Sequence, residues 1–100
     1  MKAHTLETQT TVTPEKALNF LKEGNQRFVN NLKANRDLLE QVNATRAGQW
    51  PFAVVLSCID SRTSAELIFD QGLGDIFSVR IAGNFVNKDI LGSMEFGCNV

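Results

Sequence analysis

Three side chains with chemically useful groups, Cys58, Asp60 and Arg62, are spaced two residues apart directly after an apolar run. A thiolate is a strong zinc ligand, and a carboxylate can also bind zinc. The guanidinium group of arginine stays protonated and cannot bind a metal, but it can hold a carboxylate through a bidentate ion pair. Asp60 therefore has two possible partners, a metal ion and Arg62. If Asp60 binds the metal, it fills a coordination position, and if it pairs with Arg62, that position stays open.

The same residues also fit simpler interpretations. Cys58 can be a buried structural cysteine beside a surface pair formed by Asp60 and Arg62. An enzyme that uses Cys58 as a nucleophile is a further class, although a phosphatase-type loop needs a longer separation between cysteine and arginine and more glycine. A redox pair would have the spacing Cys-x-x-Cys, whereas the second cysteine is Cys98. These alternatives stay open on the three residues alone.

The apolar run before Cys58 predicts the element that positions the three residues. Residues 52–56 are continuously apolar rather than alternating, which is typical of a strand buried on both faces. A short helix is predicted over residues 64–69, a second strand over 75–80 and a last helix from Asp89 onward. This alternation indicates an α/β fold with a parallel β-sheet core flanked by helices.

Cys58 lies at the carboxyl end of the first predicted strand. In open α/β sheets, ligands bind beyond that end of the strands. If the backbone stays extended there, the side chains of Cys58, Asp60 and Arg62 point to one side. The sequence therefore predicts one shared site for the three groups.

An N-terminal helical arm is predicted before the sheet. Residues 1–13 are polar and rich in threonine, and we predict that they form a flexible tail. The pair Thr13-Pro14 suits the N-cap and the first position of a helix. Gly24 interrupts this helix and marks a bend or a close contact. A second helix is predicted over residues 37–46.

Residues 14–100 are interpreted as the N-terminal part of one α/β domain. The helical arm takes residues 14–47, and the start of the sheet core takes residues 51–100. Two strands are fewer than the roughly 4–6 of a typical sheet. We therefore expect an incomplete domain.

The composition excludes several classes of partner. The net charge of −1 gives no basis for binding nucleic acid. No apolar stretch approaches the ~20 residues that cross a bilayer, so no membrane partner is expected. The two cysteines are too few for a disulfide scaffold and favour a reducing, cytoplasmic location.

Taken together, several segments of the chain resemble the β-class carbonic anhydrases in order and spacing. The resemblance covers roughly residues 14–100. The matching segments are Gly24-Asn25-Gln26-Arg27-Phe28, Ala47-Gly48-Gln49-Trp50-Pro51, Leu56-Ser57-Cys58-Ile59-Asp60-Ser61-Arg62, Gly74-Asp75-Ile76-Phe77-Ser78-Val79-Arg80-Ile81-Ala82-Gly83-Asn84 and Gly92-Ser93-Met94-Glu95-Phe96.

The resemblance implies a zinc enzyme that catalyses the reversible hydration of CO₂ to bicarbonate, with zinc hydroxide as the nucleophile. The family's zinc is held by two cysteines and one histidine, and Cys58 corresponds to the first cysteine. Asp60 corresponds to an aspartate that either takes the fourth coordination position or turns to Arg62. The Asp60–Arg62 pair is thus implied to gate the metal, that is, to control whether the fourth position is open. Gln49 matches a glutamine that hydrogen-bonds a substrate oxygen, often from the adjoining subunit. Phe77 is implied to line the CO₂ pocket.

The resemblance also implies that the chain assembles with copies of itself. In the family, the N-terminal helices grip a second subunit, so a homodimer or homotetramer is expected. The apolar stripe of the arm, which includes Leu21 and Phe28, serves either this contact or the chain's own core.

The chain departs from the family pattern in its ligands. The family's histidine and second cysteine follow the segment at 92–96 as a His-x-x-Cys pair, which these 100 residues do not contain. Cys98 falls too early and lacks a partner histidine, and His4 lies in the predicted tail. We therefore expect that the chain alone neither binds zinc tightly nor hydrates CO₂. The alternative is a truncated, non-catalytic dimerisation module that has lost metal binding.

Overall fold

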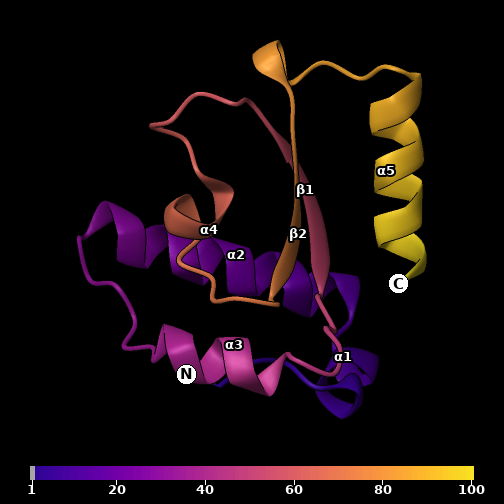
Figure 1. Cartoon of the computed structure of the whole chain (residues 1–100). Coiled ribbons are helices and arrows are strands. Elements are labelled where there is room, and N and C mark those ends of the chain that lie inside the picture. The colour runs from indigo at the N-terminus through magenta and orange to yellow at the C-terminus, as the bar shows by residue number, and fades with distance from the viewer. Residues whose placement is uncertain (1) are drawn as a thin grey trace.

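A computed structural model describes residues 2–100, and its centre is a pair of parallel strands (Figure 1). Strand β1 spans Ala53–Ser57, and β2 spans Ile76–Arg80. The register aligns Ala53 with Ile76 and Ser57 with Arg80, so both strands end at the same edge of the sheet. The predicted α/β class with a parallel sheet is confirmed.

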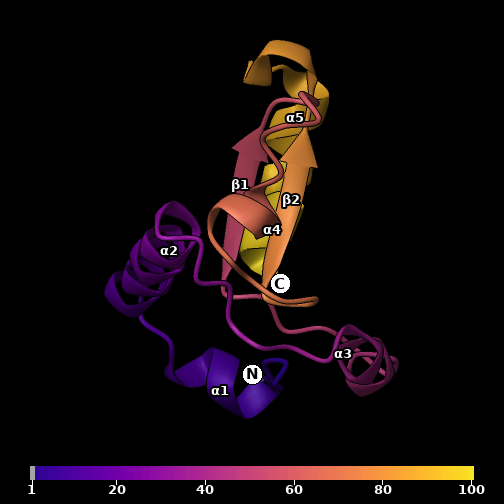
Figure 2. The ribbon, with the colours of Figure 1, turned by 90° about the vertical axis from the view of Figure 1, so that its left-hand side faces the viewer.

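Helices cover both faces of this sheet. Helix α5 (Lys88–Asn99) lies on one face and contacts both strands, while α4 (Ala65–Ile68) lies on the other (Figure 2). Helix α2 (Pro14–Val29) packs against α4 as a further layer. A Cβ atom added to Gly97 of α5 would lie only 2.8 Å from a methyl group of Val54 in β1, so α5 depends on a small residue for its close approach.

Helix α2 begins as the sequence predicts. The Thr13 side chain accepts a hydrogen bond from the backbone N–H of Lys16, and Pro14 occupies the first turn. The helix continues through Gly24 without a break. A Cβ atom at Gly24 would lie 1.6 Å from the carbonyl oxygen of Phe69, so this glycine marks a close contact rather than a bend.

The predicted tail differs from the structure. Residues Leu6–Thr11 form a short helix, α1, which is capped by reciprocal hydrogen bonds between Thr5 and Thr8. The Gln9 side chain donates hydrogen bonds to the carbonyl oxygens of Pro51, at 2.7 Å, and Val100, at 3.3 Å. Residues 6–11 therefore carry structure that the sequence did not indicate. Residue 1 of the predicted tail lies outside the described residues.

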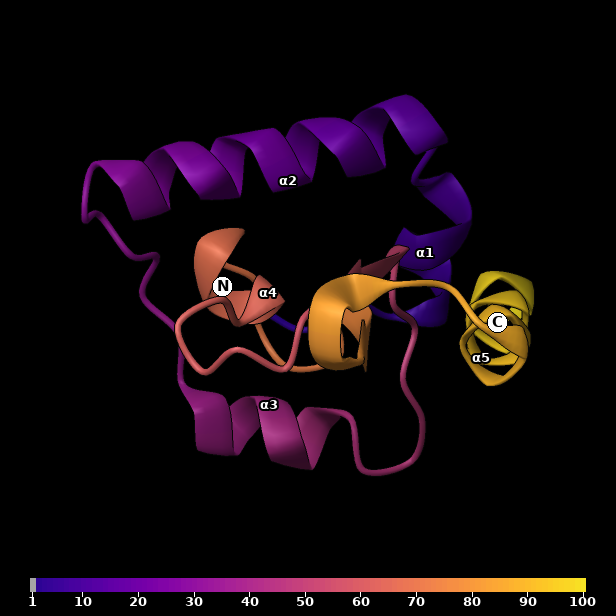
Figure 3. The ribbon, with the colours of Figure 1, turned by 90° about the horizontal axis from the view of Figure 1, so that it is seen from above.

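Helix α3 (Leu38–Ala44) completes the arm and is slightly shorter than predicted. The Asp37 side chain caps it by accepting a hydrogen bond from the backbone N–H of Glu40. Seen from above, α2 and α3 lie on two opposite sides of α4 (Figure 3). Asp70, just after α4, accepts hydrogen bonds from Arg27 of α2 and from Arg36 before α3. This buried carboxylate ties the arm to the sheet layer.

The apolar core of the described residues is small. Its buried apolar members are Ala17, Ala65, Ile76 and Ile90, and no large side chain is fully buried. Within residues 2–100, no helix is both long and apolar enough to cross a bilayer.

Candidate metal and catalytic site

The candidate site lies at the carboxyl edge of the sheet, which is at the top of Figure 1. Strand β1 ends at Ser57, and Cys58 follows it directly. Strand β2 ends at Arg80 and leads into the short turn η1 (Ala82–Asn84). Because the strands are parallel and in register, the segments after both strands meet here. This is the edge at which open α/β sheets bind ligands.

A tight turn brings Asp60 and Arg62 together. The carboxylate oxygen Oδ1 of Asp60 accepts hydrogen bonds from the backbone N–H of Arg62, at 2.9 Å, and from its Nε, at 3.0 Å. The other oxygen, Oδ2, accepts one from Arg62 Nη2 at 2.7 Å. These hydrogen bonds hold the pKa of Asp60 below its usual value. The carboxylate is therefore ionised at neutral pH and turned to the arginine.

This geometry corrects the predicted reason for the shared site. The sequence argument assumed an extended backbone from Cys58 to Arg62. The strand instead ends at Ser57, and the backbone N–H of Thr63 donates to the carbonyl oxygen of Asp60 at 3.1 Å, which closes a turn. Asp60 and Arg62 meet because the chain folds back there, as short Asp side chains favour.

Cys58 lies in an environment that favours its thiolate form. Its Sγ accepts a hydrogen bond from the backbone N–H of Gly83 in η1 at 3.3 Å. Hydrogen bonds from the backbone N–H of Asp60, and then of Gly83, lower the pKa of the Cys58 thiol, while the nearby Asp60 charge opposes this shift. Gly83 has a φ of 76°, which glycine adopts without strain. A partly exposed thiol of lowered pKa suits metal binding.

Arg80 is part of the site, although no pattern in the sequence places it there. Its Nε donates a hydrogen bond to the carbonyl oxygen of Cys58 at 2.8 Å. Its Nη2 donates to the carbonyl oxygen of Asp60 at 2.7 Å. From the sequence, Arg80 could equally have paired within the sheet or at a subunit interface. Only the register of β1 and β2 shows which groups it reaches.

The structure does not bring Gln49 or Phe77 to the same place. Gln49 is exposed and precedes β1, so the strand separates it from Cys58 within one chain. Phe77 is near the amino end of β2, and its ring lies towards Gly97 of α5. Among the described residues, neither side chain forms a hydrogen bond with Cys58, Asp60 or Arg62.

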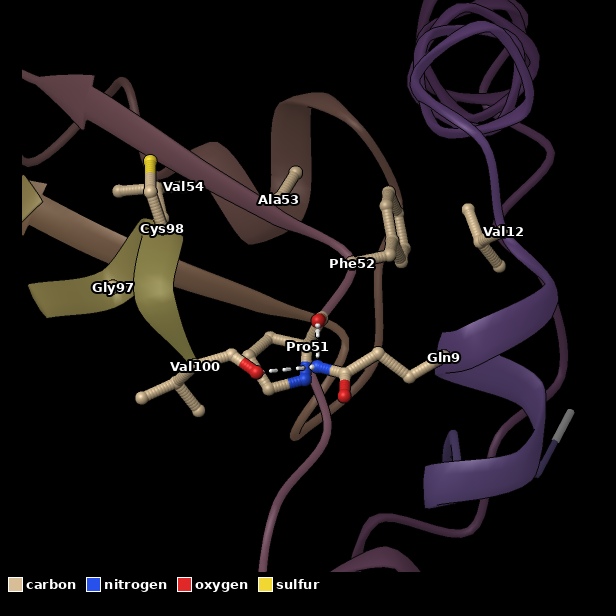
Figure 4. Close-up of a pocket in the computed structure, with 9 residues that line it drawn as sticks. All are labelled: Gln9, Val12, Pro51, Phe52, Ala53, Val54, Gly97, Cys98 and Val100. Atoms are coloured by element: carbon tan, nitrogen blue, oxygen red, sulfur yellow. Dashed lines mark hydrogen bonds between the residues drawn. The ribbon is translucent and has the colours of Figure 1, made fainter. Parts of the chain in front are cut away.

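A cavity of about 310 Å³ lies at the other end of β1 (Figure 4). It is an open pocket lined by residues of α1, the start of β1 and the end of α5, and the Gln9 side chain reaches across it to Pro51 and Val100. Cys98 lines this cavity, whereas Cys58, Asp60 and Arg62 do not. The cavity is therefore separate from the candidate site.

The described residues do not make a complete zinc site. Within residues 2–100, no group of three or more His, Cys, Asp or Glu side chains is arranged to hold a metal ion. Cys58 is suitable as one ligand, but the carboxylate of Asp60 is engaged by Arg62. Protein zinc sites use three or four protein ligands. The residues of this chain therefore fit part of a zinc site and not the whole of one.

Comparison with known proteins identifies the family. The family model described as carbonic anhydrase matches residues 53–100. The chain is 46% identical over 88 residues to "Carbonic anhydrase 2" of Mycobacterium tuberculosis (strain ATCC 25618 / H37Rv). The matched stretch covers 87% of this chain and 42% of that protein. It is 45% identical over 89 residues to a carbonic anhydrase of Mycolicibacterium smegmatis, which covers 87% of this chain and 43% of that protein. It is also 40% identical over 53 residues to a carbonic anhydrase of Synechococcus elongatus, covering 53% of this chain and 18% of that protein.

The chain thus spans less than half the length of the curated relatives that it matches. The matched stretch includes the carboxyl edge of the sheet, with Cys58, Asp60 and Arg62. On these matches, the chain belongs to the β-class carbonic anhydrase family.

Proposed function

We propose that the chain is the part of a zinc-dependent carbonic anhydrase that supplies one cysteine ligand and the aspartate–arginine pair beside it. The reaction is the reversible hydration of CO₂ to bicarbonate. The observation that carries this proposal is the arrangement at the end of β1. There the Cys58 thiol, with a lowered pKa, lies next to an Asp60 carboxylate that Arg62 holds.

Each of these residues has a distinct proposed role. Cys58 is a zinc ligand, and the remaining ligands come from outside the described residues. Bound zinc supplies Lewis-acid chemistry at neutral pH. Asp60, while it accepts three hydrogen bonds from Arg62, is not free to bind the metal. The pair therefore keeps one coordination position open, and release of Asp60 from Arg62 would close it.

The proposal includes a second copy of the chain. Gln49 is exposed before the amino end of β1, at the opposite end of the strand from Cys58. Its proposed hydrogen bond to a substrate oxygen would therefore come from the adjoining subunit of a homodimer or homotetramer. Exposed apolar side chains on the arm, among them Phe28, Leu32 and Leu39, suit contacts between subunits. Both cysteines are free thiols, which suits the proposed cytoplasmic location.

A chimeric protein tests the proposed function. This chain replaces the matched stretch of the Mycobacterium tuberculosis relative, and the rest of that protein is retained. We expect about one zinc per chain and measurable CO₂ hydration by stopped flow, because the chimera regains a full ligand set. Cys58→Ser should lose both zinc and activity, whereas Cys98→Ser, the matched control, should lose neither.

The alternative is a non-catalytic dimerisation module. It predicts a folded, dimeric chimera that lacks stoichiometric zinc and CO₂ hydration. Circular dichroism and light scattering would show that such a chimera is folded and dimeric. That result would refute the catalytic proposal.

Arg62→Ala in the same chimera tests the gate. Without the guanidinium group, Asp60 loses two side-chain hydrogen bonds and is free to bind zinc. We expect CO₂ hydration to fall by about ten-fold or more at neutral pH, while zinc content stays near one per chain. The exposed Arg46, which lies before β1, provides the control substitution Arg46→Ala. Unchanged activity in the Arg62 variant would contradict the gate.

A further inference from the structure

Arg80 makes a two-point contact at the end of β2. It is the last residue of β2 and lies opposite Ser57 in the register. Its guanidinium group donates to the carbonyl oxygens of Cys58 and Asp60, at 2.8 and 2.7 Å. Both acceptors belong to residues of the candidate site, and they are two positions apart on the same loop.

These two hydrogen bonds join β2 to the loop after β1, just beyond the last backbone hydrogen bond between the two segments. The last backbone hydrogen bond between the two segments joins the N–H of Ile81 to the carbonyl oxygen of Ser57, at 3.1 Å. Beyond it, the loop that starts at Cys58 is joined to β2 by the Arg80 side chain. The planar guanidinium fork presents two donors in fixed geometry, which a lysine ammonium group does not.

The hydrogen bonds of Arg80 are made to the backbone of the loop, while its positive charge also acts on the nearby Asp60 carboxylate. The side-chain ion pairs among residues 2–100 do not include Arg80. The backbone N–H and the hydroxyl group of Thr63 also donate to the carbonyl oxygen of Asp60, at 3.1 and 3.0 Å. Asp60 is therefore held through its backbone by Arg80 and Thr63, and through its carboxylate by Arg62.

We propose that Arg80 is a positioning residue that fixes the loop from Cys58 to Asp60, so that the thiol and the Asp60–Arg62 pair keep their relative arrangement. The inference rests on the proposed function for the meaning of that arrangement. The arrangement itself can be tested without zinc or CO₂. Failure of this test would therefore leave the proposed function standing, and the reverse also holds.

Side-chain NMR of the ¹⁵N-labelled chain provides the test. The Nε–H of Arg62, bonded to Asp60 at 3.0 Å, reports on the site. The Nε–H of Arg27, bonded to Asp70 at 2.5 Å, is an internal reference in the arm. The variants are Arg80→Met, which removes the donors but keeps an apolar side chain, and Arg80→Lys, which keeps the charge. Arg46→Met is the matched surface control.

In Arg80→Met, we expect hydrogen exchange at the Arg62 Nε–H to accelerate about five- to ten-fold, with no change at Arg27. Arg80→Lys should give an intermediate acceleration, because an ammonium group cannot reproduce the two-donor fork. Arg46→Met should change neither signal. An unchanged Arg62 signal in the Arg80 variants would overturn the proposal. Equal loss of the Arg62 and Arg27 signals in Arg80→Lys would also overturn it, because that result assigns Arg80 to general stability.

Discussion

Two aspartates of this chain, Asp60 and Asp70, show how the same carboxylate can be used in different ways. Asp60 lies at the site edge and is held by a neighbour two residues away. Asp70 is only 4% exposed and is held by arginines far away in the sequence. Burial alone would raise the pKa of Asp70. Hydrogen bonds from Arg27, the Ala34 N–H and Arg36 outweigh burial and lower the pKa to about 2.

Asp70→Asn is expected to destabilise the fold in a pH-dependent way. The folded-state pKa of about 2 lies below the ordinary value of 3.8, so the charge stabilises the fold above about pH 4. That contribution is lost as the pH falls from about 4 to about 2. At pH 7 we expect a loss of about 2 kcal/mol in the free energy of unfolding. Asp70 has a φ of 46°, a conformation that asparagine also tolerates, so the substitution removes the charge and one acceptor oxygen without adding backbone strain.

Urea unfolding of the wild type and the Asp70→Asn variant at pH 7 and pH 3 would measure this difference. The difference should shrink at the lower pH, because the carboxyl group of the unfolded wild type, with its ordinary pKa of 3.8, is largely protonated at pH 3. Asp37→Asn is a suitable control, because that exposed aspartate caps α3 and asparagine caps helices equally well. A difference independent of pH would show that the carboxylate charge is not the cause.

At the residue scale, the sequence identified the groups whose partners are close in the chain. The types and spacing of Asp60 and Arg62 made their ion pair one of two predicted arrangements, although the prediction assumed an extended backbone and the pair in fact forms in a turn. The partners of Arg80 and Asp70 could not be predicted. In both cases the donor and the acceptor lie on different elements of the chain. Only the packing of those elements decides which donor reaches which acceptor.

At the scale of elements, the helical arm meets the sheet layer through a close backbone contact. Gly24 of α2 lies against the carbonyl group of Phe69, at the end of α4, and Asn25 donates to the carbonyl oxygen of Ile68 at 3.1 Å. The Gln71 side chain donates a hydrogen bond to the carbonyl oxygen of Phe20 in α2 at 3.3 Å. These contacts require α2 to approach α4 more closely than a side chain at position 24 would allow.

Gly24→Ala should therefore separate α2 from α4. The added Cβ would lie 1.6 Å from the Phe69 oxygen, which is backbone and cannot rotate away. We expect a loss of about 3 kcal/mol or more in the free energy of unfolding, measured by urea denaturation. Gly92→Ala in α5 is the matched control. A Cβ there meets nothing within 4 Å, and alanine should stabilise the helix by about 0.5–1 kcal/mol. Equal effects of the two substitutions would exclude the close contact as the cause.

Most elements could be predicted because their signals are local. The Thr13-Pro14 start of α2 and the apolar run of β1 each reflect the conformation of a few adjacent residues. Helix α1 was missed because its cap uses Thr8 where a capping box usually has Glu or Gln. Its other support is the Gln9 contact with Pro51 and Val100, which no local pattern indicates.

At the scale of the whole molecule, the described chain buries little apolar surface. Its buried apolar side chains are few and mostly small, while large ones such as Leu39, Val29 and Phe96 are at least 66% exposed. A sheet of two strands offers only two faces of limited area. The candidate site is incomplete in the same sense, since the described residues contain no cluster of three metal-binding side chains. The described residues thus leave large apolar side chains exposed and the metal ligand set incomplete.

The last prediction concerns the isolated chain of 100 residues. With Cys58 as one available ligand and Asp60 held by Arg62, zinc binding should be weak and CO₂ hydration should stay at the uncatalysed rate. Metal analysis after dialysis should find far less than one zinc per chain, and Cys58→Ser should behave like the wild type in stopped-flow assays. The active chimera provides the positive control under the same conditions. Stoichiometric zinc together with CO₂ hydration by the isolated chain would overturn this prediction.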